Sequence, residues 1–120
     1  MIKNLITESF SLNLHTNVSF VPNAAERALD PIIKNGIQNV TIVIDHGVIE
    51  NDRMEIFLKE IRDNLKVKKM ISYHGGEPTY TKLEEIRDEI NDKKTGAIFA
   101  IGGGSTIDVG KALAVLLTNP

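Results

Sequence analysis

The sequence predicts an α/β domain of three layers, in which helices flank both faces of a parallel sheet. From residue 24 onward, segments with helical periodicity alternate with three short apolar segments that are typical of strands. Strands that are joined by helices run parallel, with right-handed crossovers. Each of the three predicted strands ends in a loop that contains glycine, so three such loops are expected at one edge of the sheet.

The composition indicates a single globular domain and excludes several classes of function. A chain of 120 residues, 42% hydrophobic and 25% charged, suits one domain over residues 1–120. The net charge of −2, with no cluster of Lys or Arg, argues against a nucleic-acid partner. No segment is apolar enough for a membrane span or a signal peptide, so we expect a cytoplasmic protein. The absence of cysteine excludes disulfides and thiolate chemistry.

The N-terminal quarter of the chain is predicted to hold a short β-hairpin and the first helix. Apolar residues alternate loosely over residues 10–20, which suggests one or two short strands. Asn23 and Glu26 have the spacing of a capping box and would open a helix that continues to Gly36. Pro31 lies inside that helix and is expected to kink or split it, because proline has no N–H to donate.

The first predicted strand of the sheet is Val40 to Ile44, a run of mainly β-branched residues of the kind that is buried on both faces of a parallel sheet. It ends at Asp45. Asp52 is expected to cap the next helix, whose apolar positions recur every three or four residues. These apolar positions are Met54, Phe57, Leu58, Ile61 and Leu65.

The second strand, Lys69 to Tyr73, ends at His74 and two glycines. Thr79 or Thr81 then opens a helix with an apolar face formed by Leu83, Ile86 and Ile90. The third strand is predicted from Ala97 to Ile101. The three strands together give a Rossmann-like sheet whose carboxyl edge forms one ligand crevice.

The glycine run after the third strand carries the strongest functional signal. Gly102, Gly103 and Gly104 separate the strand from an amphipathic helix that Ser105 is expected to cap and that ends at Thr118. Asp108 would add an acidic group to its first turn. Backbone N–H groups at a helix start have no internal partner, and glycine lets an anion approach the main chain closely. A phosphate site is therefore predicted here.

Other interpretations of the glycine run can be weighed from its spacing. A flexible linker would also contain glycine and serine, but strand and helix flank this loop with almost no slack. The P-loop pattern fails because Ser105 stands at its first glycine and Ala112 follows Lys111. The dinucleotide fingerprint fails at its third glycine, where Ile107 stands.

Residues at the predicted edge offer further chemistry. Asp45 is placed to accept hydrogen bonds from an adenosine ribose and to repel a 2′-phosphate, which would favour NAD over NADP; alone, it would more often be a turn aspartate. His46 and His74 are expected at the same edge without a third metal ligand, and are interpreted as loop histidines near a polar ligand rather than a metal site. Lys111 either reaches an anion or is a solvated side chain.

The run Gly102, Gly103, Gly104, Ser105, Asp108 and Lys111, with the spacing GGGSxxDxxK, resembles the signature of the iron-dependent alcohol dehydrogenase family. The resemblance covers roughly residues 18–120. VSFVPNA at residues 18–24 is similar to the family's glycine-containing entry to its first helix, and VTIVIDHGV at residues 40–48 to its strand that ends in Asp. Glu77-Pro78-Thr79 aligns with Asn-Pro-Thr in many members, and Glu77 departs from that pattern.

The resemblance implies a role for each matched residue. Asp45 would hold the adenosine ribose, with Glu77 on the adenosine side. Gly102, Gly103, Gly104 and Ser105 would hold the pyrophosphate, and Asp108 would lie towards the nicotinamide. No residue of this chain would be catalytic or bind metal.

The resemblance also implies the nature of the parent enzyme, a two-domain NAD(P)-dependent alcohol dehydrogenase. Its iron or zinc would be held by a following helical domain, and its substrates would be small alcohols or carbonyl compounds. A homodimer is implied for the full-length protein. The 120-residue chain is then expected to be a fragment that binds the dinucleotide weakly and catalyses nothing.

Two other readings remain open from the sequence. The chain could come from a superfamily member that resembles dehydroquinate synthase or glycerol dehydrogenase. It could instead be a non-catalytic nucleotide-binding module that is complete by itself. Solubility and cooperative unfolding would favour such a module, and an exposed apolar face would favour a severed domain.

Overall fold

The computed structural model describes residues 27–76, 78–91 and 95–118. Within these ranges it holds a three-stranded parallel sheet with the strand order β2-β1-β3. The elements, in chain order, are α3 (Asp30–Lys34), β1 (Asn39–Asp45), α4 (His46–Ile49), α5 (Asp52–Asn64), β2 (Lys66–Tyr73), α6 (Tyr80–Asn91), β3 (Ala97–Ile101) and α7 (Gly104–Thr118). The predicted α/β fold with a parallel sheet is confirmed.

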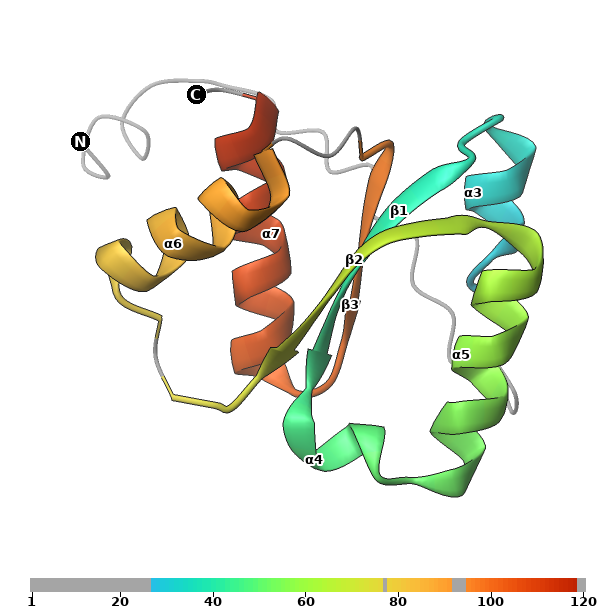
Figure 1. Cartoon of the computed structure of the whole chain (residues 1–120), viewed down its shortest axis with the longest axis horizontal. Coiled ribbons are helices and arrows are strands. Elements are labelled where there is room, and N and C mark those ends of the chain that lie inside the picture. The colour runs from blue at the N-terminus through green and yellow to red at the C-terminus, as the bar shows by residue number, and fades with distance from the viewer. Residues whose placement is uncertain (1–26, 77, 92–94, 119–120) are drawn as a thin grey trace, which may run out of the picture.

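The sheet lies between two helical layers, with α6 and α7 on one face and α3 and α5 on the other (Figure 1). One core cluster joins β1 to α5 and the other joins β1 and β2 to α6 and α7. The first contains Val40, Ile42, Ile44, Phe57, Leu58 and Ile61, and the second contains Val43, Ile71, Ile86, Ile90, Val109 and Leu113. Because successive residues of a strand point to opposite faces, β1 contributes to both clusters.

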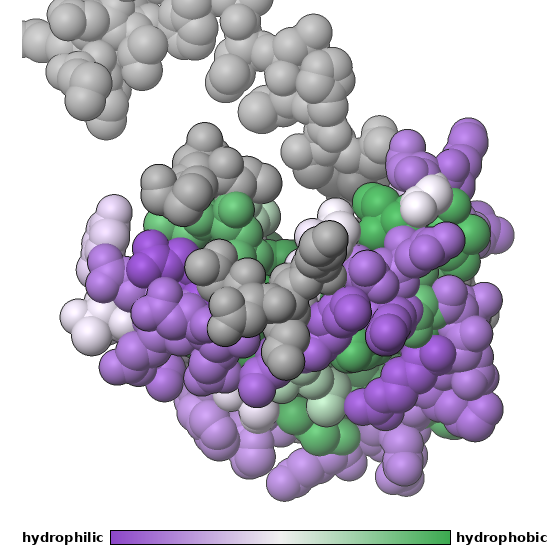
Figure 2. Space-filling model, turned by 45° about the horizontal axis from the view of Figure 1, so that its top comes forward, coloured by the Kyte–Doolittle hydropathy of each residue, from purple (hydrophilic) through white to green (hydrophobic). Residues whose placement is uncertain are grey.

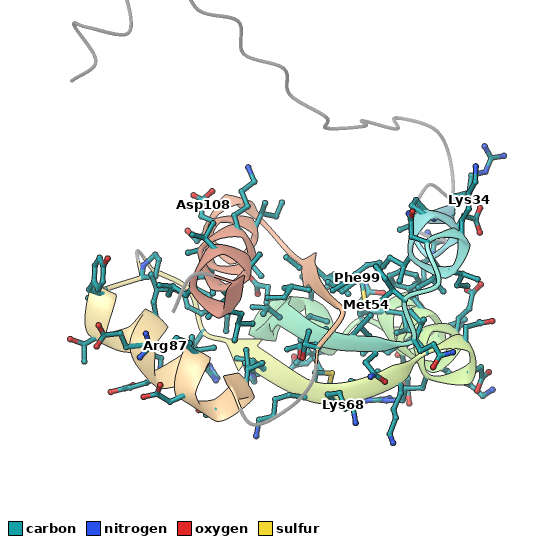
Figure 3. All side chains as sticks on the ribbon, turned by 90° about the horizontal axis from the view of Figure 1, so that it is seen from above. Lys34, Met54, Lys68, Arg87, Phe99 and Asp108 are labelled. Atoms are coloured by element: carbon teal, nitrogen blue, oxygen red, sulfur yellow. The ribbon has the colours of Figure 1, made fainter. Side chains whose placement is uncertain are left out.

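The strands differ in burial because, among the described strands, only β1 has a neighbour on both sides. Residues 40–44 of β1 are all buried, whereas every residue of the apolar strand β3 is half-buried. Phe99 of β3 points towards α5 beside Met54 (Figure 3) and contacts the Phe57 ring edge-on at 5.9 Å between centroids. Figure 2 shows several apolar areas among hydrophilic residues on one face of the molecule. Val115 of α7 is a large apolar residue that is 59% exposed.

The structure corrects the predicted cap of α5. Asn51, and not Asp52, is the N-cap, because the Asn51 Oδ1 atom accepts a hydrogen bond of 2.9 Å from the Arg53 N–H. Asp52 is the first residue of the helix, where the positive end of the helix dipole stabilises its negative charge. Both residue types are good caps, so the sequence could not separate them.

The first predicted helix is split in the structure. Arg27 is helical, residues 28–29 form a turn, and helix α3 begins at Asp30. Pro31 lies in the first turn of α3, where its missing N–H is not needed. The prediction that Pro31 would kink or split the helix is confirmed as a split. Asn23, Glu26 and the predicted hairpin over residues 10–20 lie outside the described residues.

Strand β2 is longer than predicted, and α6 begins at the first of its two candidate caps. Three lysines at positions 66, 68 and 69 hide the start of β2 in the sequence, but charged residues are well tolerated at the edge of a sheet. The Lys66 N–H donates a hydrogen bond of 2.8 Å to the Gln38 carbonyl oxygen. The Thr79 hydroxyl accepts one of 3.1 Å from the Lys82 N–H, so Thr79 caps α6.

Candidate functional site

The candidate site lies where the three parallel strands end. Asp45, the last residue of β1, pairs in register with Tyr73 at the end of β2, and Ile44 pairs with Ile101 at the end of β3. The chain places β2 on one side of β1 and β3 on the other, so the order reverses at β1. In open parallel sheets this reversal marks the crevice in which ligands bind. The prediction that the strand tips converge is confirmed.

Asp45 also starts a short helix that the sequence did not predict. Its Oδ1 atom accepts a hydrogen bond of 2.8 Å from the Gly47 N–H and caps α4. Asp45 is therefore a turn aspartate, which is one of the two roles predicted for it. Within the described part of the chain, the Asp45 Oδ2 atom forms no hydrogen bond. One carboxylate oxygen thus orients the side chain, and the half-buried group keeps an acceptor for a ligand.

Gly102 brings the loop after β3 against the tip of β1. A Cβ atom at this position would lie 2.7 Å from the Asp45 Cβ atom and 3.0 Å from the Thr106 Oγ1 atom. The backbone φ of Gly102 is +149°, a region that residues with a side chain rarely adopt. Only glycine fits there, and its presence holds Asp45 and the glycine loop in contact.

The next two glycines face open space. An added Cβ atom at Gly103 or Gly104 would have no neighbour within 4 Å among the described atoms. Helix α7 begins at Gly104, and the Gly103 carbonyl oxygen accepts a hydrogen bond of 3.1 Å from the Ile107 N–H. The N–H groups of the first turn therefore lie next to an exposed, side-chain-free surface, which is the geometry of an anion site.

The predicted role of Ser105 as N-cap is wrong. Gly103 occupies the capping position, and Ser105 lies inside the first turn, half-buried. Among the described residues its hydroxyl has no hydrogen-bond partner, so it is available to a ligand at the helix start. The sequence favours Ser105 over Gly103 as the N-cap, because serine is a stronger N-cap residue than glycine.

Gly110 and Thr106 are two residues whose roles the sequence analysis missed. A Cβ atom on Gly110 would lie 2.7 Å from the Ala100 Cβ atom, so α7 packs directly on β3 at this point. The third glycine of a dinucleotide fingerprint has the same function. Thr106 is 2% exposed beneath the glycine loop. A glycine within an apolar helical pattern was the available signal for Gly110.

The two loop histidines come together, as expected. The rings of His46 and His74 are stacked with 4.3 Å between centroids and 29° between planes. The His46 Nδ1 atom is 3.2 Å from the Ser72 Oγ atom. Within the described ranges, no three histidine or acidic side chains are close enough to hold a metal ion. These residues therefore do not fit the iron of the resembled family.

The remaining predicted site residues are Asp108, Lys111 and Glu77. Asp108 is exposed on α7, on the side that faces away from the sheet (Figure 3). Lys111, one turn further on, is exposed as well. Glu77 lies outside the described residues.

A pocket of about 510 Å³ lies beside the crevice, between β2 and α6. Its lining includes Ser72, His74, Thr79 and Lys82, but none of the residues of the glycine loop. It therefore extends the β2 end of the edge and is separate from the site at β1 and β3. None of the described helices has the length and apolar character that a membrane crossing requires.

A comparison with models of known protein families shows the family of this chain. Residues 15–120 match the model of iron-containing alcohol dehydrogenases. The chain belongs to this family. The glycine loop, Asp45 and the parallel sheet all lie within the matched residues.

The chain is also similar to individual dehydrogenases, and it spans only a small part of the length of each. It is 35% identical over 63 residues to 4-hydroxybutyrate dehydrogenase of Clostridium kluyveri, covering 52% of this chain and 17% of that protein. It is 46% identical over 40 residues to glycerol-1-phosphate dehydrogenase [NAD(P)+] of Thermoplasma volcanium, covering 33% of this chain and 11% of that protein.

A solved structure supports the fold. NADH-dependent butanol dehydrogenase A of Thermotoga maritima superposes with a TM-score of 0.75 over 90% of this chain and 27% of its own. At 22% sequence identity, this likeness bears on the fold alone. The Rossmann-like arrangement predicted from the sequence is therefore shared with this solved structure.

Proposed function

We propose that this chain supplies the dinucleotide-binding edge of a nicotinamide-dependent alcohol dehydrogenase. The full protein would transfer hydride between the nicotinamide and a small alcohol or carbonyl substrate. The observation that carries the proposal is the loop after β3, which packs on Asp45 through Gly102 and leaves Gly103 and Gly104 open at the start of α7. The name of one relative, glycerol-1-phosphate dehydrogenase [NAD(P)+], supports the same coenzyme class.

Each residue of the edge has a specific task in this proposal. The N–H groups of Gly104 and Ser105, with the Ser105 hydroxyl, hold the diphosphate, since the first turn of a helix has unpaired donors and a positive dipole end. Gly103 leaves space for the diphosphate to approach the main chain. Asp45 accepts hydrogen bonds from the adenosine ribose through the oxygen that α4 does not use. Asp108 lies further along α7, towards the nicotinamide.

The charge of Asp45 favours NAD over NADP, because a carboxylate repels a 2′-phosphate and accepts hydrogen bonds from a 2′-hydroxyl. A solved relative with this fold is described as NADH-dependent, which agrees with that preference. NAD is therefore the proposed coenzyme. Glu77 is proposed to lie on the adenosine side of the same site.

The metal and the substrate belong to other parts of the proposed enzyme. The family is iron-containing, and iron or zinc would be bound by residues that the described part of this chain does not supply. A cytoplasmic location and a homodimer of the full-length protein complete the proposal.

The anion site can be tested by two matched variants at Gly103. Gly103→Asp and Gly103→Asn both place a good N-cap at the start of α7, so both should keep the stability of the native chain to within about 1 kcal/mol. Only the aspartate adds a negative charge where the diphosphate would bind. We expect the dissociation constant for NADH, measured by calorimetry, to be at least about tenfold higher for Gly103→Asp than for Gly103→Asn.

The comparison of the two variants decides between an anion site and a structural loop. Thermal unfolding of both variants checks that the fold is intact. Equal affinities of the two variants for NADH would show that no diphosphate binds at the start of α7, and would contradict the proposal.

A further inference from the structure

The turn that joins α3 to β1 contains the single Asn-Gly step of the sequence. Asn35 follows the last residue of α3 as its C-cap, and Gly36 comes next with a backbone φ of +74°. Both residues are exposed. In such a step the side-chain amide lies next to a backbone nitrogen that no side chain shields, because glycine has none. Asn35 and Gly36 can therefore react with each other.

The reaction that this pair permits is deamidation, which needs only water. The Gly36 nitrogen loses its proton and attacks the Asn35 Cγ atom, the Cγ–Nδ2 bond breaks, and ammonia leaves. The product is a cyclic imide, and water then opens one of its two bonds between carbonyl carbon and nitrogen. One opening leaves an aspartate at position 35. The other leaves an isoaspartate, in which the side-chain carboxyl carbon carries the main chain on to Gly36.

In the folded chain, both reacting groups are hydrogen-bonded to carbonyl groups of α3. The Asn35 Nδ2 atom donates a hydrogen bond of 2.6 Å to the Pro31 carbonyl oxygen. The Gly36 N–H donates one of 3.0 Å to the Ile33 carbonyl oxygen. The Gly36 nitrogen must lose this proton and approach the Asn35 side chain before it can attack. The reaction therefore requires the end of α3 to open first.

The residue after Gly36 stabilises the closed end of α3. The Ile37 N–H donates a hydrogen bond of 3.1 Å to the Ile32 carbonyl oxygen, and with the bond from Gly36 this completes a Schellman cap. Ile32 and Ile37 both pack against the core cluster that joins β1 to α5. Ile37 also lies against Gly96, where an added Cβ atom would be 2.8 Å from the Ile37 Cγ2 atom. Truncating Ile37 should thus loosen the cap without changing the two reacting residues.

We propose that Asn35 is a deamidation site whose rate is set by the opening of the cap at the end of α3. Either product carries a negative charge beside the last carbonyl groups of α3, where the helix dipole is also negative. Neither product keeps the N–H donor that binds the Pro31 carbonyl oxygen. Isoaspartate also lengthens the main chain before Ile37. The modification therefore weakens the cap and the entry to β1.

The site is separate from the proposed coenzyme site. The cap of α3 precedes β1, whereas Asp45 ends that strand, so the two lie at opposite ends of β1 (Figure 1). Asn35→Asp carries the charge of the product. Its affinity for NADH should equal that of the native chain, so dinucleotide binding and deamidation are tested independently.

The test follows the 120-residue chain at about pH 8, in buffer and in guanidinium chloride, by peptide mapping with mass spectrometry. We expect Asn35 to convert to both products, and to do so at least about tenfold faster in guanidinium chloride, because the hydrogen bonds of the cap must open first in the folded chain. Asn39, Asn51 and Asn64 are internal controls and should stay intact over the same period, since a bulkier residue than glycine follows each of them.

Two matched variants test the control by the cap. Ile37→Ala should raise the rate in buffer at least about threefold and leave the rate in guanidinium chloride unchanged. Ile98→Ala is the control, because Ile98 is also half-buried but packs against the other core cluster. Its rate in buffer should stay within about twofold of the native rate. Circular dichroism shows whether both variants are folded.

Each outcome supports or refutes the proposal. No conversion of Asn35 in guanidinium chloride would refute the site, and this measurement needs no variant. Equal rates in buffer and in guanidinium chloride would show that the fold does not restrain the reaction. An equal rise in both variants, or no conversion of Ile37→Ala in buffer, would show that the cap does not control it. Each of these results would refute the proposal and leave dinucleotide binding intact.

Discussion

Replacing Gly102 with alanine is expected to lower the free energy of unfolding by about 2–6 kcal/mol, the sum of overpacking and backbone strain of about 1–3 kcal/mol each. The added Cβ atom would lie 2.7 Å from the Asp45 Cβ atom and 3.1 Å from the Thr106 Cβ atom. Neither neighbour can move easily, because Asp45 caps α4 and Thr106 is 2% exposed. The variant should also lose NADH binding, since the loop could no longer contact Asp45.

Chemical denaturation measures this loss, and Gly104→Ala is the matched control. Position 104 is the first residue of α7, and no described atom lies within 4 Å of an added Cβ atom. Alanine there should change the stability by no more than about 1 kcal/mol, and in the stabilising direction, because alanine favours a helix more than glycine does. Equal stabilities of Gly102→Ala and the native chain would show that the loop does not pack on Asp45 as described.

The second large effect is expected at Gly110, where α7 contacts β3. Helix propensity alone predicts that Gly110→Ala would stabilise the chain by about 1 kcal/mol. The structure predicts the opposite sign, because the new Cβ atom would lie 2.7 Å from the Ala100 Cβ atom. Val109 and Leu113 beside it are completely buried, so α7 cannot shift without opening the core. We expect a loss of about 2 kcal/mol in the free energy of unfolding.

A compensating change tests the cause of that loss. Ala100→Gly removes the methyl group that the new side chain would meet. In the double variant Gly110→Ala with Ala100→Gly, the two changes should be less destabilising together than the sum of the separate effects, by about 1 kcal/mol or more. Strict additivity, or a stabilising effect of Gly110→Ala alone, would mean that the helix and the strand do not touch at this point.

Much of the fold was predictable because it depends on the spacing of apolar residues within short segments of the sequence. The β-branched run of β1 and the three-and-four spacing of α5 and α6 directly reflect burial on the sheet. The ends of β3 were predicted at Ala97 and Ile101 because Gly96 precedes the strand and Gly102 follows it. The site edge then followed from the rule that parallel strands end together, which brought Asp45 near Gly102.

What was missed depends on contacts between elements or on the choice between similar caps. Gly110 is important because of Ala100, ten residues away in the sequence and on another element, so no local pattern shows it. The N-cap of α5 is Asn51 and not Asp52, and the N-cap of α7 is Gly103 and not Ser105. In both cases neighbouring residues can each cap a helix, and only the path of the backbone decides which of them does. Helix α4 was missed because four residues are too few for a periodic pattern.

The most direct test of the central claim is a titration of the isotopically labelled chain with NADH, followed by the chemical shifts of its backbone amides. We predict that the largest changes occur at Gly103, Gly104 and Ser105, with a second group at Asp45 to Gly47. No change at these amides at saturating NADH, or changes confined to the pocket between β2 and α6, would contradict the account.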